Sequence, residues 1–297
     1  MRHLIWLLQF LLIVLLSFPL AILPYKLALR TGSLLGSLLF LIWKSRRRIA
    51  IDNLKAAVSK GAVIINSDPE HVIRQNFRNL GKSFIEILKI YYGLGNRIFS
   101  NIEIKGAENI RRAYEKGKGI LFITGHCGNW ELMALCIGKN VLHVSNIARK
   151  INNPYLNYAA EQARQKSGNK IIYKQGALKK ILSLLRNNGA IGILMDQSVI
   201  SSEGIIADFL GSKAYTMKMP AMIARKTGSP VIPAFIRRAE NGHIIEIGRE
   251  IDLDDSDDAD KAIFNDTVKF SGFIEDYIRQ NPYEWLWIHR KWKKRKD

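Results

Sequence analysis

Two long apolar stretches begin the chain. Residues 4–23 contain Gln9 as their one strongly polar side chain, and residues 27–43 form a second stretch that Arg30 and two glycines interrupt. About 20 apolar residues are enough to cross the hydrocarbon core of a bilayer, so the pattern predicts an N-terminal membrane anchor helix. A single span, a helical hairpin and a pair of interfacial helices all fit it. A cleaved signal peptide fits less well, because the stretch is long and no small-x-small cleavage site precedes Tyr25.

The pattern changes after Asp68. Residues 69–92 place apolar side chains at steps of three and four, which predicts a long amphipathic helix. Short apolar runs and helical patterns then alternate. Strands are expected at residues 102–104, 120–124, 141–147, 170–173, 190–195, 231–236 and 243–247, and helices at 108–115, 154–166, 177–187, 219–226 and 259–280. This alternation predicts an α/β fold in which helices flank a mixed, mostly parallel sheet.

Candidate chemistry follows the apolar run at residues 120–124, where His126 lies on the turn before a helical pattern that starts near Trp130. On one continuous helix, His126 and Glu131 would point about 140° apart. They can converge if Glu131 lies in the first turn behind an Asn129 cap. The segment therefore suggests a general base, His126, that Glu131 orients. A solvated loop histidine beside an ordinary first-turn glutamate is the alternative.

In open α/β sheets, ligands bind outside the carboxyl ends of the strands, and both His126 and Asp196 follow such ends. Cys127 and Cys136 are the chain's two cysteines, so the sequence predicts neither a disulfide framework nor a zinc site. A thiol beside a histidine leaves an acyl-enzyme on Cys127 as an alternative.

The chain is strongly basic, with 45 Lys and Arg against 26 Asp and Glu and a formal charge of +19. Such a surface attracts polyanions, which include nucleic acids, anionic lipids and acidic proteins. Basic residues cluster directly after Trp43, and the positive-inside tendency places them in the cytoplasm. We therefore expect a membrane anchor and juxtamembrane segment at residues 1–45 and a catalytic domain at 46–297.

Several blocks of sequence resemble the lysophospholipid acyltransferase superfamily, and within it the bacterial lipid A late acyltransferases. The superfamily mark is a histidine, four residues and then Asp or Glu, here His126 to Glu131. Narrower matches to the late acyltransferases occur in the family's order along nearly the whole chain. These are residues 125–131, 148–150 with 153–154, 162–164, 194–197, 209–211 with Ala214 and Thr216, 224–233 and 284–292.

The resemblance implies a glycerolphosphate-acyltransferase-like domain at the bacterial inner membrane, with its catalytic part on the cytoplasmic face. It implies transfer of a fatty acyl group from acyl carrier protein to a hydroxyl of a lipid A precursor, with neither cofactor nor nucleic acid involved. An anionic phospholipid surface is a further expected partner.

The resemblance also assigns substrate-binding roles. Arg149 and Arg164 are expected to bind phosphate or phosphopantetheine oxygens, and Asp196 to hold an arginine or an acceptor hydroxyl. Asn129 is expected at the substrate, and the amides of Gly128 and Asn129 are the candidate oxyanion donors.

Two alternatives stay open. The protein could be an acyltransferase of another membrane acceptor, such as a phosphatidylinositol mannoside, an aminolipid or a lysophospholipid, with acyl-CoA as a possible donor. It could also be a non-catalytic basic adaptor. Lys150, where several members of the family carry proline, and residues 198–202, which replace a more acidic stretch, leave selectivity undecided. Trp285, Trp287 and Trp292 are expected at the membrane interface, in preference to stacking on nucleic-acid bases.

Overall fold

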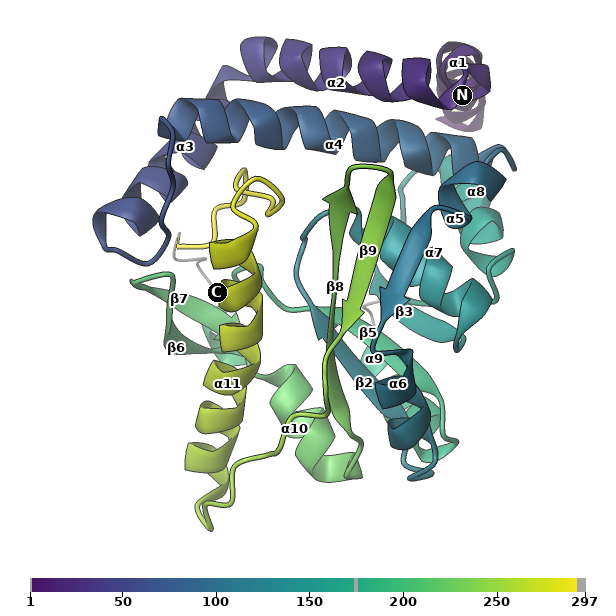
Figure 1. Cartoon of the computed structure of the whole chain (residues 1–297). Helices are drawn as coiled ribbons and strands as arrows, with labels where there is room; N and C mark the ends of the chain where they lie inside the picture. The colour runs from purple at the N-terminus through teal and green to yellow at the C-terminus, as the bar shows by residue number, and fades with distance from the viewer. Residues whose placement is uncertain (1, 174–175, 293–297) are drawn as a thin grey trace.

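The computed structural model describes residues 2–173 and 176–292, which are built around a seven-stranded sheet (Figure 1). The strand order is β1 (Ile102–Lys105), β9 (Gly242–Ile247), β8 (Val231–Ala239), β2 (Ile120–Thr124), β5 (Ala190–Leu194), β3 (Val144–Ala148) and β4 (Lys170–Tyr173). β8 and β9 pair antiparallel, and every other neighbouring pair is parallel. The predicted fold class, a mixed and mostly parallel sheet flanked by helices, is confirmed.

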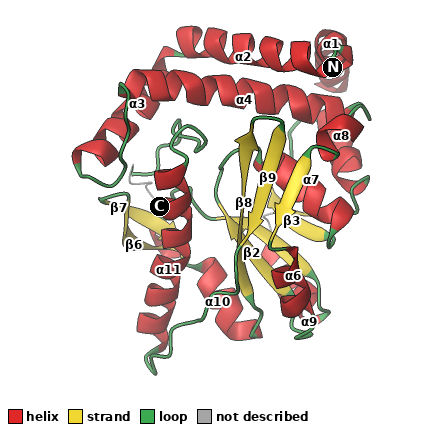
Figure 2. Cartoon of the chain, in the orientation of Figure 1, coloured by secondary structure: helices red, strands yellow, loops and turns green. Residues whose placement is uncertain are grey.

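Helices cover both faces of this sheet (Figure 2). The central strand β2 is wholly buried, and its alternate residues enter two different cores. Ile120 and Phe122 pack with α6 (Ala107–Tyr114) and α7 (Trp130–Asn140). Leu121 and Ile123 pack with α9 (Ala177–Arg186), α10 (Met219–Thr227) and α11 (Ala259–Gln280). A strand buried on both faces reads as a continuous apolar run, which is why the pattern located it.

The N-terminal part forms α1 (Arg2–Ile22), α2 (Tyr25–Ile42), α3 (Lys44–Ser59) and α4 (Pro69–Tyr91). α4 crosses the end of the sheet, α2 lies along α4, and α1 runs at a steep angle to both (Figure 1). By length and composition, α1 and α2 are each apolar enough to cross a membrane. α2 nevertheless uses one side to pack on the protein.

Glycines allow α2 and α4 to approach backbone to backbone. A Cβ added at Gly36 would collide with the carbonyl oxygen of Phe77, and one added at Gly81 would collide with that of Gly32. Gly32 and Gly36 are four residues apart and so share one face of α2, which is the small-xxx-small arrangement of closely packed helices. Lys89 also fixes this region, because its Nζ donates to the carbonyl oxygens of Ala21 and Leu23 at 2.6 and 2.7 Å.

Several elements were not predicted. These are α3, α5 (Asn96–Phe99), the short 3-10 helix Ser201–Glu203 and the hairpin of β6 (Gly204–Phe209) and β7 (Ser212–Met217). The remaining helix is α8 (Pro154–Gln165). α8 begins behind Asn153, whose side chain accepts from the amides of Tyr155 and Leu156.

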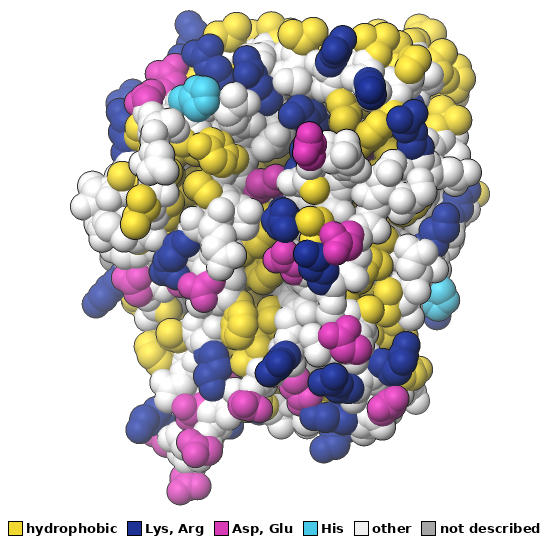
Figure 3. All heavy atoms as spheres, viewed as in Figure 1, with side chains coloured by type: hydrophobic (Ala, Val, Ile, Leu, Met, Phe, Trp, Pro, Cys, Tyr) yellow, Lys and Arg dark blue, Asp and Glu magenta, His cyan; other side chains and the backbone are white. Residues whose placement is uncertain are grey.

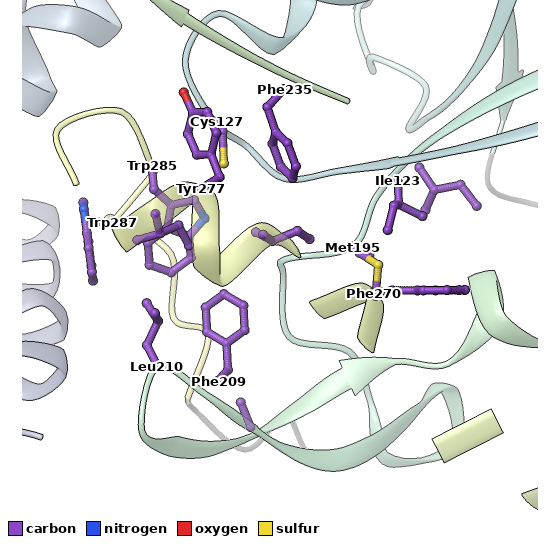
Figure 4. Close-up of a cluster of buried hydrophobic side chains, with 14 of the residues drawn as sticks. Ile123, Cys127, Met195, Phe209, Leu210, Phe235, Phe270, Tyr277, Trp285 and Trp287 are labelled. Atoms are coloured by element: carbon purple, nitrogen blue, oxygen red, sulfur yellow. The ribbon is translucent and has the colours of Figure 1, made fainter. Parts of the chain in front are cut away.

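The prediction that the C-terminal tryptophans lie at the membrane interface is wrong for two of them. Trp285 and Trp287 are fully buried, and they pack in the core with Tyr277 and Phe209 (Figure 4). Trp292 is partly buried, and its Nε1 donates to the carbonyl oxygen of Phe209. The aromatic-basic composition of the tail cannot distinguish an interfacial belt from a segment that folds back onto the core.

We predict that Gly36→Ala lowers the free energy of unfolding by about 1–3 kcal/mol, because the new methyl group must push α2 away from α4. Gly272→Ala in α11 is the matched control. Its Cβ would meet no atom within 4 Å, so better helix propensity should stabilise it by roughly 0.5–1 kcal/mol. Thermal unfolding in detergent measures both changes, and equal stability of the two variants would contradict the packing argument.

Candidate active site

His126 and Asp196 meet at the carboxyl ends of two neighbouring strands. Thr124 of β2 pairs with Leu194 of β5, and each site residue lies two positions further along its own strand. His126 Nδ1 lies 2.8 Å from Asp196 Oδ1, and the backbone amide of His126 donates to Asp196 Oδ2 at 3.0 Å. Both residues therefore follow the carboxyl ends of their strands, as expected, and Asp196 pairs with His126 and not with the expected arginine.

Asp196 is buried and ionised. Burial alone would raise its pKa, but the charge of His126 and hydrogen bonds from His126 and Trp285 hold the pKa well below its usual range. Trp285 Nε1 donates to Oδ2 at 2.8 Å. An ionised carboxylate can only accept hydrogen bonds, so Nδ1 of His126 carries a proton, and in the neutral imidazole Nε2 is then the acceptor.

The contact with Asp196 raises the pKa of His126. Burial alone would lower this pKa, but the charge of Asp196 and its hydrogen bond raise it above the ordinary value. The imidazole keeps 16% of its side-chain surface exposed, so the ring can be reached from outside.

Gln197 and His289 lie on the free side of the imidazole. Gln197 Nε2 is 3.0 Å from Nε2 of His126 and 3.0 Å from Nε2 of His289. The ring of Trp130 contacts His126 edge-on with centroids 5.1 Å apart. A substrate hydroxyl that uses Nε2 must therefore replace the Gln197 amide there.

Glu131 does not contact His126 in this structure, contrary to the expectation that it orients the base. It is instead bound by Arg164, whose Nε and Nη2 reach the two carboxylate oxygens, the second at 3.0 Å. The hydroxyl of Tyr91 donates to Glu131 Oε1 at 3.2 Å. The strand, turn and capped helix arrangement was predicted correctly, because Asn129 Oδ1 accepts from the Leu132 amide. The directions of the His126 and Glu131 side chains were not predicted correctly.

The turn between His126 and α7 also differs from expectation. The Gly128 amide donates to the carbonyl oxygen of Glu284 at 2.8 Å, so it is not open to an oxyanion. The Asn129 side chain is buried and caps α7, while its Nδ2 donates to Glu86, so it does not face a substrate. Within the described part of the chain, the amides of Asn129, Trp130 and Glu131 have no hydrogen-bond acceptor.

Arg149 is exposed, whereas Cys127 is buried in the core. Arg149 follows β3 and is exposed at the carboxyl edge of the sheet, on the same side as His126. Cys127 points into the core beside Tyr277 (Figure 4), where burial raises the pKa of its thiol well above the ordinary value. A buried, protonated thiol is not a nucleophile, so the acyl-enzyme alternative has no support.

An apolar pocket of about 200 Å³ lies between the sheet and α7. It exceeds the roughly 150 Å³ of an apolar cavity that holds benzene. Glu131 and Arg164 are polar members of its wall. The remaining lining is mostly apolar and includes Phe122, Met133, Ala134, Ile137, Val144 and Leu194. Among the described residues, no group of three or more His, Cys, Asp or Glu could hold a metal ion.

Four residues of the site were not predicted from the sequence: Gln197, His289, Trp285 and Glu86. Three of them stand in blocks that carry the family resemblance, but nothing in the sequence said that these blocks meet at His126. Glu86 belongs to an amphipathic helix pattern and has no local signal.

Comparison with known proteins identifies the family of this chain. The sequence signature described as bacterial lipid A biosynthesis acyltransferase matches residues 1–294. The lipid A biosynthesis palmitoleoyltransferase of Escherichia coli is 25% identical, over 92% of this chain and 87% of that protein. The lipid A biosynthesis lauroyltransferase of Escherichia coli is also 25% identical, over 93% and 88%. A phosphatidylinositol mannoside acyltransferase of Mycolicibacterium smegmatis is 19% identical, over 75% and 73%. The chain belongs to the bacterial lipid A biosynthesis acyltransferase family and is an acyltransferase.

Proposed function

We propose that this enzyme transfers a fatty acyl group from acyl carrier protein to a hydroxyl of a lipid A precursor, with His126 as general base. The observation that carries the proposal is the buried Asp196 carboxylate on Nδ1 of a reachable histidine beside an apolar pocket. This arrangement fixes the tautomer in which Nε2 can take a proton, and a carboxylate in this position also stabilises the imidazolium that forms. Glu131 then acts through Arg164 and not as the partner of the base.

The proposed reaction is a direct transfer. The acceptor hydroxyl replaces the Gln197 amide at Nε2 and gives its proton to His126 while its oxygen attacks the thioester carbonyl. The tetrahedral intermediate collapses, the carbon–sulfur bond breaks, and the imidazolium returns the proton to the leaving thiolate. Free amides at the first turn of α7, those of Trp130 and Glu131, are the proposed oxyanion donors, because a helix N-terminus stabilises negative charge.

The pocket beside Glu131 and Arg164 is proposed to hold the acyl chain. Its wall is mostly apolar, and its two charged members are paired with each other at the wall, where the polar end of a thioester would lie. Arg164 uses Nε and Nη2 on Glu131. Its other guanidinium hydrogens remain for a carbonyl or phosphate oxygen of the donor.

Membrane association follows from the surface around α1 and α2. The edge of the molecule where these helices lie is largely hydrophobic (Figure 3). Leu8, Leu12, Leu16, Leu34, Leu38 and Ile42 are among the exposed apolar side chains there. Lys44, Arg47 and Arg48 line a hollow of about 330 Å³ at the start of α3, together with Asp52 and Glu70. Such a basic rim beside an apolar face suits anionic phospholipid head groups.

We propose that residues 1–45 form this membrane-contacting part, that 46–297 form the acyltransferase domain, and that the enzyme works on the cytoplasmic face of the inner membrane. Tyr91, the last residue of α4, and Tyr92, its C-cap, support a short distance between membrane and site. The Tyr92 hydroxyl is 2.8 Å from Ser17 Oγ of α1, and Tyr91 binds Glu131. An acceptor held in the bilayer would thus reach the site beside α1.

Different observations support the proposed donor and the proposed acceptor. A formal charge of +19 would speed the encounter with an acidic carrier protein. Similarity to phosphatidylinositol mannoside acyltransferases keeps a second acceptor class in view. Mass spectrometry of lipid A from a strain that lacks its own late acyltransferases, with and without this protein, tests the acceptor.

We predict that His126→Ala lowers acyl transfer by roughly 10²–10⁴-fold, because the positioned base is lost. His71→Ala, which removes an exposed histidine from α4, is the control and should leave the rate unchanged. Transfer from acyl carrier protein thioesters to purified acceptor in mixed micelles measures both. Wild-type turnover in His126→Ala would refute the assignment.

The pH dependence provides a second prediction. His126 must be neutral to accept a proton, so activity is present above its pKa and is lost as the pH falls through it. Asp196 raises this pKa. Asp196→Asn should therefore move the acid limb of kcat/KM to lower pH while it lowers the maximal rate. Circular dichroism confirms folding of the variant, and an acid limb that stays in place would exclude His126 as the titrating group.

A third prediction concerns chain length. Ala134→Leu adds bulk to the wall of the pocket and should shift preference toward shorter acyl chains. Each excluded methylene forfeits about 0.8 kcal/mol, or roughly fourfold in kcat/KM. Competition between carrier thioesters of different length measures the shift, and a short-chain donor that stays fully active is the internal control. An equal loss for all acyl-chain lengths would mean that the acyl chain binds outside this pocket.

A further inference from the structure

Glu86 is a fully buried carboxylate at which several structural elements meet. Arg238 donates to both of its oxygens, at 2.8 and 2.9 Å, and His243 Nε2 lies 3.0 Å from Oε1. The hydroxyl of Tyr25 donates to Oε1 at 2.9 Å, and Asn129 Nδ2 donates to Oε2 at 3.0 Å. Burial alone would raise the pKa of Glu86, but the charge of Arg238 and the hydrogen bonds hold it well below its usual range.

These donors come from distant parts of the sequence. Tyr25 begins α2, Asn129 ends the turn after β2, Arg238 lies in β8 and His243 lies in β9. A buried carboxylate needs a counter-charge and hydrogen bonds, and Arg238 supplies the charge. The bond to Asn129 is not needed for neutralisation, and it reaches the segment that contains His126.

The Asn129 side chain is fixed at both ends. Its Oδ1 accepts from the Leu132 amide and caps α7, and its Nδ2 binds Glu86. The same turn is held a second time, because the Gly128 amide donates to the carbonyl oxygen of Glu284. Glu284 Oε1 in turn accepts from the backbone amide of Arg238, whose side chain binds Glu86, so Arg238 contacts both residues that hold the turn.

We infer that Glu86 is a positioning residue for the catalytic turn. Through Asn129 it fixes the start of α7, and with it the direction of the His126 ring and of the free amides of Trp130 and Glu131. Glu86 has no exposed surface, so it does not contact a substrate. The inference rests on the proposed role of His126 as base.

Two substitutions separate positioning from folding. Asn129→Ser keeps a good N-cap for α7 but removes the amino group that Glu86 accepts from. Glu86→Asp keeps the negative charge for Arg238 but shortens the side chain by one methylene, which withdraws it from Asn129. Both variants break the same bond from opposite sides.

A second buried pair provides the control. Asp266 in α11 is fully buried, lies 2.6 Å from Arg225 and accepts from the amide of Asp254. None of these contacts involves the catalytic turn. Asp266→Asn should therefore lower the melting temperature without a change in the kcat of the folded enzyme.

The experiment compares kcat and KM of the full-length enzyme in mixed micelles. We expect Asn129→Ser and Glu86→Asp each to lower kcat about tenfold, with KM within about threefold, and the double variant to lose about tenfold and not a hundredfold, since both changes break one bond. Wild-type kcat in the folded single variants would overturn the inference, as would full additivity in the double variant.

A readout without turnover distinguishes this inference from the proposed function. The titration of His126 can be followed by NMR on histidine-labelled protein, with His126→Ala to identify its signal. A loosened turn weakens the contact with Asp196, so the midpoint in Asn129→Ser should move down toward the ordinary value. An unmoved midpoint would overturn the positioning role. A moved midpoint together with an active His126→Ala would instead refute the proposed base.

Discussion

The site depends on one buried charge, the carboxylate of Asp196. It accepts hydrogen bonds from the imidazole and the amide of His126 and from the indole of Trp285. A carboxylate removed from water is stable only when such partners surround it. The ends of β2 and β5 and the C-terminal segment are therefore held together by the requirement to satisfy this group. The same requirement places a proton on Nδ1 of His126, the proposed base, so stability and the proposed chemistry have one cause.

A second buried charge, Glu86, extends this arrangement toward the membrane side of the molecule. Its donors include Tyr25 at the start of α2 and Asn129 at the cap of α7. The packing of α2 on α4 through Gly32, Gly36 and Gly81 brings the apolar helices close enough for these contacts. An apolar surface and a polar site thus share α4 as their common support. This suits the proposed reaction, in which the acceptor lies in a bilayer and the donor arrives from water.

The histidine and glutamate of the sequence motif have separate partners. His126 pairs with Asp196, which lies 70 residues away, whereas Glu131 pairs with Arg164 at the wall of the apolar pocket. A spacing of five residues across a turn and a helix start places two side chains in one region. It does not fix which way each one points, because that depends on the charges that surround them. Here the surrounding contacts decide that Asp196 pairs with His126 and that Glu131 pairs with Arg164.

The sequence by itself determined the strands and helices of the sheet, the turn after β2 and the cap at Asn129, because these follow from local periodicity and capping. It also brought His126 and Asp196 to one edge, since parallel strands end together. Only the tertiary structure decided that Asp196 pairs with His126, that the Gly128 amide is occupied and that Trp285 is buried beneath the site. These contacts join residues that are far apart in the chain, and a buried charge or indole makes them only when the core is folded. Local sequence patterns therefore do not reveal them.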